Sequence, residues 1–244
     1  NTTINYINNL FKEIPNTKIF ISPGNHDPYL NNSIYANFNW NNNVIIFNSN
    51  IKKYSYEDVD IYGYGFTDFY CENSIINNLK IENKNKINIL VMHANLDQIS
   101  DKKYNEVKTK DLDKLEFDYI ALGHIHKRNF DDSMQENIIY PGSTLALGFD
   151  EQGKHGIIEG EINNKDLKLK FIPLDEKEFN IINLDVTEII SKEELIEKIN
   201  NLELIENNYY EIIFVGRRNF EINKYEINKF IIKNNVRKLK DNTK

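Results

Sequence analysis

The chain has 244 residues, of which 40% are hydrophobic and 12% aromatic, so it can bury the core of one large domain, or of one domain with a small appendage. It contains no run of eighteen apolar residues, which excludes a membrane-spanning helix, and its one cysteine, Cys71, excludes an internal disulfide. We therefore expect a cytoplasmic protein without a membrane partner. The formal net charge of −7 argues against unaided, non-specific DNA binding, but it allows DNA to be held through metal ions or a basic partner.

The first half of the chain predicts an alternation of helices and strands. Residues 2–13 carry apolar side chains at helical spacing, and Pro15 ends this predicted helix. A second helix is expected over residues 74–81, and a helical turn over residues 111–115. Short apolar runs predict strands over residues 18–22, 44–47, 59–62, 87–92 and 119–122.

Polar residues follow the ends of these predicted strands. Four of the five histidines occur where a strand stops, namely His26, His93, His124 and His126. Because open α/β sheets place their sites at the carboxyl ends of strands, we expect these histidines to form a site. At the last strand, Gly123 lets the chain turn, and His124 and His126 lie on the same side if the extended geometry persists. Two neutral imidazoles in that position are compatible with a transition-metal site.

The second half of the chain predicts a hairpin and then a separate small unit. A strand at residues 138–140 ends in a Pro-Gly turn, and the strands at 156–162 and 167–173 form the hairpin. Ser191 and Glu194 predict a capping box at the start of a later helix. We therefore expect two domains, residues 1–175 and a small C-terminal α/β domain of residues 176–244 that is incomplete. Its predicted elements are a strand at 179–186, a helix at 191–202, a strand at 209–215, a helix at 223–233 and a strand at 236–239.

Three histidine motifs in this order resemble those of the calcineurin-like metallophosphoesterases: Gly24-Asn25-His26-Asp27, Val91-Met92-His93-Ala94 and Gly123-His124-Ile125-His126. Tyr140-Pro141-Gly142-Ser143 and Gly148-Phe149-Asp150-Glu151-Gln152-Gly153 look like the DNA-repair exonuclease branch of that superfamily, the SbcD/YhaO type. The resemblance implies an α/β fold, a four-layer αββα core with a small α/β capping domain. The family's opening Asp-x-His and Gly-Asp motifs are not in this sequence, so we expect an N-terminally truncated chain whose core lacks its first strands.

The resemblance also implies the roles of the site residues. Asn25, His93 and His124 would bind one divalent metal ion, and His126 would bind a second. His26 would be the catalytic histidine that binds no metal, because it can protonate the leaving oxygen near neutral pH. Imidazole and oxygen donors suit manganese, iron or zinc, and the branch favours Mn²⁺.

The function implied by this resemblance is metal-dependent phosphodiester hydrolysis of DNA, by a bridging hydroxide between two metal ions. The chain would be the exonuclease subunit of a double-strand-break repair complex with an SMC-like ATPase as partner. A homodimer is compatible with this assignment. Two alternatives remain. One is a phosphatase or small-molecule phosphodiesterase of the same superfamily, and the other is a catalytically inactive fragment that lacks half of the metal site.

Other side chains have simpler interpretations. We expect Asp27 to be a turn acceptor, and His155, which lies among glycines, to be an exposed turn residue. Tyr29, Tyr64 and Phe66 could stack on a nucleobase, but packing within the protein is their expected role. Basic residues near the C-terminus could contact a DNA backbone, although a solvated surface is the default expectation for them: Arg217, Arg218, Lys229, Lys233, Arg237, Lys238 and Lys240.

Overall fold

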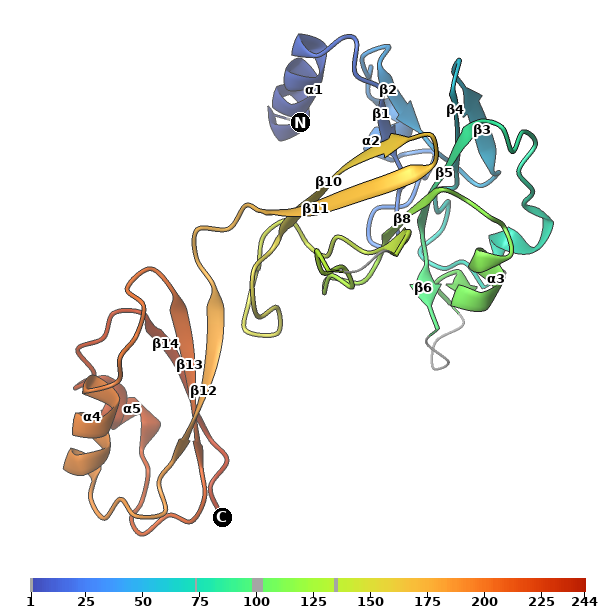
Figure 1. Ribbon diagram of the computed structural model, residues 1–244. Coiled ribbons are helices and arrows are strands. Elements are labelled where there is room, and N and C mark those ends of the chain that lie inside the picture. The colour runs from blue at the N-terminus through green and yellow to red at the C-terminus, as the bar shows by residue number, and fades with distance from the viewer. Residues whose placement is uncertain (1, 73, 98–102, 134–135) are drawn as a thin grey trace. The chain divides into compact units, whose positions relative to one another are not determined.

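The structure is a computed structural model that describes residues 2–72, 74–97, 103–133 and 136–244 (Figure 1). The chain divides into two compact units. Residues 1–142 and 158–172 form the first unit, and residues 143–157 and 173–244 form the second. The expected boundary after residue 175 stays a prediction. No helix among the described residues is long and apolar enough to cross a membrane.

The first unit is built around a five-stranded sheet in the order β3-β4-β5-β8-β9. β3 is antiparallel to β4, and the other neighbours are parallel. The central strands are apolar runs in which every second side chain is buried, because the faces of a strand alternate. The strands are β3 (Lys52–Ser55), β4 (Val59–Gly63), β5 (Ile87–His93), β8 (Tyr119–Gly123) and β9 (Ile138–Ile139).

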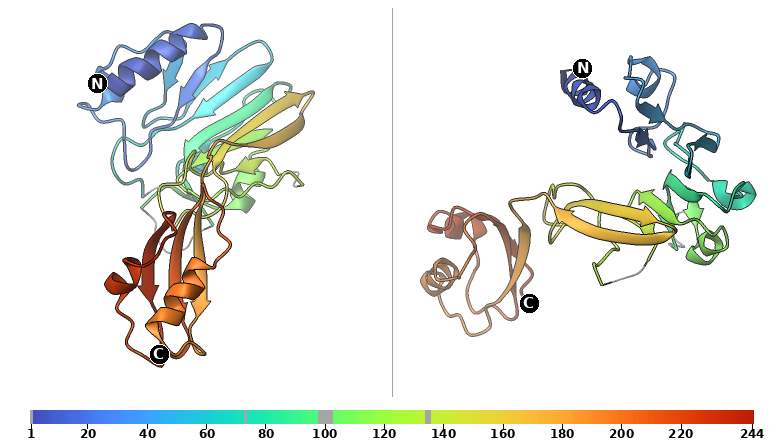
Figure 2. Two further views of the ribbon diagram at one scale, coloured as in Figure 1. Left: turned by 90° about the vertical axis from the view of Figure 1, so that its left-hand side faces the viewer. Right: turned by 45° about the horizontal axis from the view of Figure 1, so that its top comes forward.

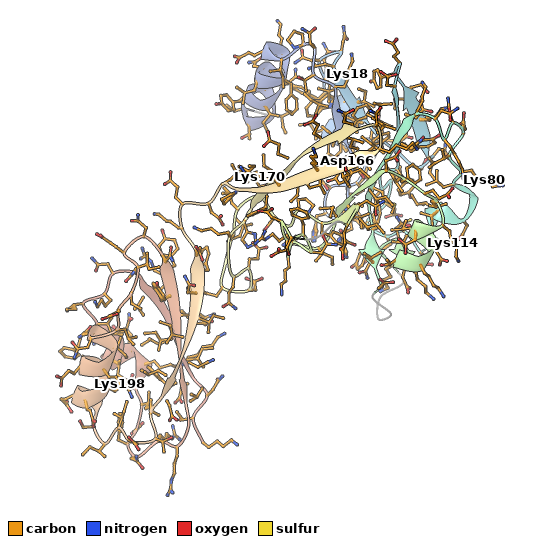
Figure 3. All side chains as sticks on the ribbon, viewed as in Figure 1. Lys18, Lys80, Lys114, Asp166, Lys170 and Lys198 are labelled. Atoms are coloured by element: carbon orange, nitrogen blue, oxygen red, sulfur yellow. The ribbon has the colours of Figure 1, made fainter. Side chains whose placement is uncertain are left out.

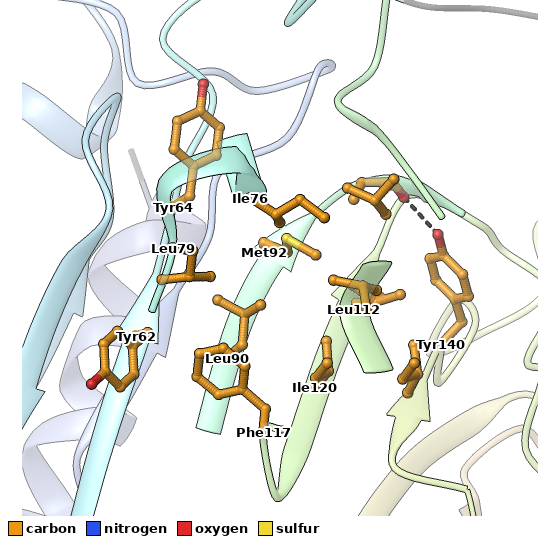
Figure 4. Packing of buried hydrophobic residues seen from close by; sticks show 14 of the residues in the cluster. Tyr62, Tyr64, Ile76, Leu79, Leu90, Met92, Leu112, Phe117, Ile120 and Tyr140 are labelled. Carbon is orange, nitrogen blue, oxygen red and sulfur yellow. Dashed lines mark hydrogen bonds between the residues drawn. The ribbon is translucent and has the colours of Figure 1, made fainter. Parts of the chain in front are cut away.

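One face of this sheet packs on short helices and loops to form the main core (Figure 4). Leu90, Met92 and Ile120 point from the central strands toward Leu112 of helix α3 (Thr109–Asp113), and all four are fully buried. Burial of each such side chain stabilises the fold by about 1.5–3 kcal/mol. Tyr140 closes the edge, since its hydroxyl donates to the Ala94 carbonyl at 2.6 Å.

Smaller elements complete the first unit. Helix α1 (Thr2–Glu13) agrees with the prediction, and the Asn43 side chain donates to carbonyls at and beyond its end. Asn164 and Lys165 both have positive φ, which produces a type I′ turn in the hairpin. The remaining elements are β1 (Ile19–Ile21), parallel to β2 (Val44–Ile46); α2 (Ile34–Asn37); the 3₁₀ turn η1 (Ile75–Asn78); β6 (Asn95–Leu96), parallel to β7 (Glu106–Val107); and the hairpin of β10 (Gly156–Asn163) and β11 (Asp166–Pro173).

The second unit has a three-stranded parallel sheet in the order β12-β13-β14, with both of its helices on one face (Figure 2). Apolar residues from the strands and from α4 and α5 form its core, with Leu195 and Ile227 fully buried. Charged side chains such as Lys198, which donates to the Asp185 carbonyl, are exposed (Figure 3). The elements are β12 (Phe179–Asp185), α4 (Lys192–Asn200), β13 (Tyr209–Val215), α5 (Lys224–Asn228) and β14 (Val236–Asp241).

The helix ends of this unit differ in detail from the predictions. Ser191 caps α4 by accepting from the Glu194 backbone N–H at 3.2 Å. The Glu194 carboxylate, however, accepts from the backbone of Ile190 and does not close a capping box on Ser191. Helix α5 is shorter than the predicted 223–233, because the Asn200 side chain bonds the Phe230 carbonyl and the Ile232 N–H that a longer helix would use.

Candidate metal centre

Three polar side chains are brought together by the ends of β1, β5 and β8. β5 and β8 are parallel with His93 opposite Gly123, so His124 follows directly beside the end of β5. Asn25 lies in the loop after β1. Asn25, His93 and His124 are half-buried, whereas His26 and His126 are exposed.

The three half-buried side chains meet at one atom, Nε2 of His93. This nitrogen lies 2.8 Å from Oδ1 of Asn25 and 3.1 Å from Nδ1 of His124. The His93 ring is also packed edge-on against Phe66, with ring centroids 5.3 Å apart, and His124 lies 5.1 Å from the ring of Tyr104. The sequence-predicted set Asn25, His93 and His124 is thus in mutual contact.

The donor set suits a cation. An amide oxygen and imidazole nitrogens offer lone pairs, and these are atoms that bind divalent cations in proteins. Two ligand atoms at about 2.1 Å from a metal ion and at right angles to each other are about 3.0 Å apart, which is close to the observed spacing. Asn25, His93 and His124 therefore fit the first-row divalent ions that accept imidazole and amide ligands.

Gly24 and Gly123 have no Cβ atom, and the ring of His93 occupies the room that this provides. A Cβ atom at Gly24 would lie 2.5 Å from Cε1 of His93, and a Cβ atom at Gly123 would lie 3.1 Å from Nδ1. Cβ atoms in proteins do not come as close as 2.5 Å to a ring atom. Gly24 is thus required by contact with His93, and the sequence alone did not indicate this role.

The turn after β8 is made by His124, not by Gly123. His124 has φ +114°, a backbone conformation that costs a non-glycine residue of order 1–3 kcal/mol. Gly123 completes the strand and gives room to the ring opposite it. The extended backbone that would place His124 and His126 on the same side therefore ends at His124. The prediction that the chain turns at Gly123 is wrong, because the turn is made one residue later. Strain of this kind is concentrated at functional sites in proteins.

Electrostatics favour the neutral, metal-binding form of His93. Burial lowers its pKa, and the charges of His124, His26 and His126 lower it further, to about 3. The other three histidines at the strand ends are therefore close enough to act on His93. Because neutral imidazole is the form that binds metal ions, His93 is ready as a ligand at neutral pH without losing a proton.

The loop that carries Asn25 and His26 is fixed by Asp27. Oδ1 of Asp27 accepts from the Gly24 backbone N–H at 3.1 Å, and Oδ2 accepts from the Tyr35 hydroxyl at 2.5 Å. The turn-acceptor interpretation of Asp27 is confirmed. Tyr35 belongs to the same network, yet no spacing signal in the sequence pointed to it.

The prediction that His155 is an exposed turn residue is wrong. His155 is buried, with Nδ1 2.7 Å from Oγ of Ser143, and its backbone N–H donates to Asp175 at 2.8 Å. Glu151 accepts from Ser143 and from the Leu147 backbone. Ser143 thus contacts both Glu151 and His155 within the second unit. Tyr64 and Phe66 are buried in the first unit, as expected for packing residues.

No group of three or more His, Cys, Asp or Glu side chains is placed to hold a metal ion in the described parts of the chain. The centre consists of two imidazoles and an amide, and the second ion assigned to His126 stays a prediction.

The family model for the calcineurin-like phosphoesterases matches residues 1–128, which include the three histidine motifs. The chain belongs to the calcineurin-like phosphoesterases. This family binds divalent metal ions, and membership indicates metal-dependent hydrolysis of phosphoesters. The superfamily and the α/β fold predicted from the histidine motifs are confirmed.

A curated relative is the uncharacterized metallophosphoesterase YhaO of Bacillus subtilis (strain 168), which is 37% identical over 78 residues. The match covers 32% of this chain and 19% of YhaO, so it spans about a fifth of that relative. The exonuclease branch, and the expectation that the chain is truncated, stay predictions.

Proposed function

We propose that this chain is the catalytic part of a phosphodiesterase that acts on DNA as an exonuclease. The observation that carries the proposal is the convergence of Asn25, His93 and His124 on one point, in a chain that belongs to a family of metal-dependent phosphoesterases. A divalent ion at that point would neutralise the phosphate and supply hydroxide at neutral pH.

The chain's own residues would divide the work. Asn25, His93 and His124 are neutral ligands, so they would leave the charge of an ion available to the phosphate. His126 would hold the second ion. His26 is exposed next to Asn25, where its imidazole could give a proton to the leaving oxygen.

DNA is favoured over a small phosphoester by features outside the centre. The segments at residues 140–143 and 148–153, with the small α/β unit after them, support the exonuclease branch and an SMC-like ATPase as partner. The net charge of −7 agrees with DNA held through metal ions and a partner instead of through the bulk charge of this chain. Manganese is the proposed metal.

The test uses the full-length protein with Mn²⁺ and compares three substrates: linear duplex DNA, bis-p-nitrophenyl phosphate and p-nitrophenyl phosphate. We expect DNA digestion, a fall of about 10²–10⁴-fold for His26→Ala, and unchanged metal binding in that variant. Asn32→Ala, which removes an exposed amide outside the centre, is the control. Hydrolysis of the monoester without any digestion of DNA would replace the proposal with a phosphatase.

A second candidate is that the 244-residue chain by itself binds a metal ion without turnover. Two imidazoles and one amide are a weak ligand set, and this observation favours it. Metal analysis of the purified chain after Mn²⁺ loading and desalting should give at most one ion per chain. Two ions per chain together with DNA digestion would exclude this candidate.

A further inference from the structure

The second unit contains a basic cavity that the proposed hydrolysis does not use. Nine of the 30 Lys and Arg residues lie within residues 215–244, against three acidic residues there. A cavity of ≈ 450 Å³ opens among the loops of this unit. Its charged lining consists of Lys177, Lys233, Arg237 and one carboxylate, Glu206.

Tyr209 holds two of these cations in place. The Lys177 ammonium donates to the Tyr209 hydroxyl at 3.3 Å, and the Arg237 guanidinium carbon lies 4.9 Å from the centre of the ring. The ring itself packs against Phe179, with centroids 5.3 Å apart. A cation over an aromatic face is attracted by the ring, so these side chains are partly ordered before any ligand arrives.

A β-bulge directs Arg237 to this ring. Along the parallel pair β13 and β14, Tyr210 is opposite Val236 and Glu211 is opposite Lys238, which leaves Arg237 as the extra residue. Bulges are rare between parallel strands, and they re-aim side chains, often next to functional sites. The bulge allows Val236 to stay in the core while Arg237 faces the cavity.

The lining of the cavity has three cationic side chains and one carboxylate, Glu206. Among the described residues, Lys177, Lys233 and Arg237 form no ion pair with a carboxylate. The neighbouring Lys238 and Lys240, in contrast, both lie 3.1 Å from the buried carboxylate of Glu211. Strand β14 thus carries Lys238 and Lys240, which are paired with Glu211, and Arg237, which lines the cavity together with Lys177 and Lys233.

We propose that this cavity binds the phosphate group of a nucleotide, either free or within a nucleic acid strand. A guanidinium fork with two ammonium groups is suited to phosphate oxygens. Leu204 and the exposed Ile232 offer an apolar wall to the nucleoside. The cavity volume lies in the range of small-molecule sites, about 300–1,000 Å³. The proposal does not depend on hydrolysis at the metal centre.

The experiment measures binding to the 244-residue chain in EDTA, so that the metal centre contributes nothing. Three probes are used: inorganic phosphate, ADP and a fluorescein-labelled single-stranded 12-mer. The test variant is K233Q/R237Q. The control is R217Q/K229Q, which removes the same charge from the same unit, and Lys229 lies 4.3 Å from the Tyr225 ring, so a similar cation–aromatic contact is lost.

We expect K233Q/R237Q to weaken the binding of ADP or the 12-mer about tenfold, and R217Q/K229Q to change it less than about twofold. Binding of ADP that depends on the cavity identifies a free nucleotide as the source of the phosphate, and dependence seen only with the 12-mer identifies a strand. Equal losses in the two double variants, or no binding of any probe, would overturn the proposal. Lys233 is half-buried and the other three side chains are exposed, and matching thermal unfolding curves would show that folding is unaffected in both variants.

Discussion

The Glu211 carboxylate and the half-buried His93 imidazole differ in the charges that face them. In the second unit, Glu211 is 1% exposed, and Oε1 of its carboxylate lies 3.1 Å from the ammonium nitrogens of both Lys238 and Lys240. In the first unit, His93 faces an amide oxygen and a second imidazole, and the other charges that act on it come from histidines. The carboxylate faces two counter-charges from its own unit, whereas the atoms around His93 are of the kind that suits a cation.

The pKa values of the two groups express the same contrast. Burial acts to raise the pKa of Glu211, but contacts with Lys240 and Lys238 outweigh it and hold the pKa below the ordinary value. For His93, burial and the neighbouring imidazoles act in the same direction and lower the pKa. Removal of the lysine partners of Glu211 should therefore lower the free energy of unfolding. Removal of a partner of His93 should mainly weaken metal binding.

The largest effect is expected when both lysines are removed. Lys238→Ala combined with Lys240→Ala leaves the buried Glu211 carboxylate without a counter-charge. Breaking a buried pair in this way costs about 3–5 kcal/mol, and we expect the low end because both ammonium groups are half-exposed. Urea unfolding at pH 7 measures it. Lys229→Ala is the control, and a double variant as stable as that control would show that Glu211 does not need its partners.

The second prediction concerns His93→Gln, which keeps a polar side chain but removes the imidazole. The loss of a direct ligand should weaken Mn²⁺ binding about 100-fold, while unfolding in EDTA changes by about 1 kcal/mol or less. Calorimetric titration with Mn²⁺ measures the affinity. The double lysine variant is the matched control, since it should bind Mn²⁺ as the parent chain does. Unchanged affinity in His93→Gln would remove His93 from the metal centre.

The sequence predicted the elements that have their own local signal. The apolar runs of β5 and β8 and the helical spacing of α1 are sufficient to identify them, because burial follows from composition and periodicity. Strands β6 and β7 have two residues each and exist through their pairing with each other. Such short pairs have no periodicity of their own, and they were not predicted.

The residues of the candidate metal centre could likewise be predicted where a local sequence motif marks them. The motifs placed Asn25, His93 and His124 at strand ends, and the structure brings these three into contact. The positive φ of His124 could not be predicted, because it depends on how β8 ends against its neighbour. The burial of His155 could not be predicted, because its partners Ser143 and Asp175 are 12 and 20 residues away in the chain, and a local window around two glycines does not include them.

The third prediction tests the close packing around His93. In Gly24→Ala the new methyl group would lie 2.5 Å from Cε1 of the ring, so the ring or the loop must move. We expect a loss of about 1–3 kcal/mol in stability and a roughly tenfold weaker Mn²⁺ affinity. Gly148→Ala is the matched control, since its methyl group meets only the flexible carboxylate of Asp150. Equal Mn²⁺ affinity in the two variants would mean that the position of the ring does not control binding.

The smallest effect is the pH dependence of the Glu211 centre. A carboxylate whose pKa is lowered by folding binds fewer protons in the folded state than in the unfolded state, so it stabilises the fold above the ordinary value of 4.5. This contribution is lost as the pH falls below 4.5 and through the lower pKa of the folded state. Glu211→Gln has no such charge, so the difference in unfolding free energy between parent and variant should be constant above about pH 5 and should shrink below it. Because His93 titrates in both proteins, its contribution cancels in the difference. A difference that grows as the solution is acidified would show that burial, and not the two lysines, controls the Glu211 carboxylate.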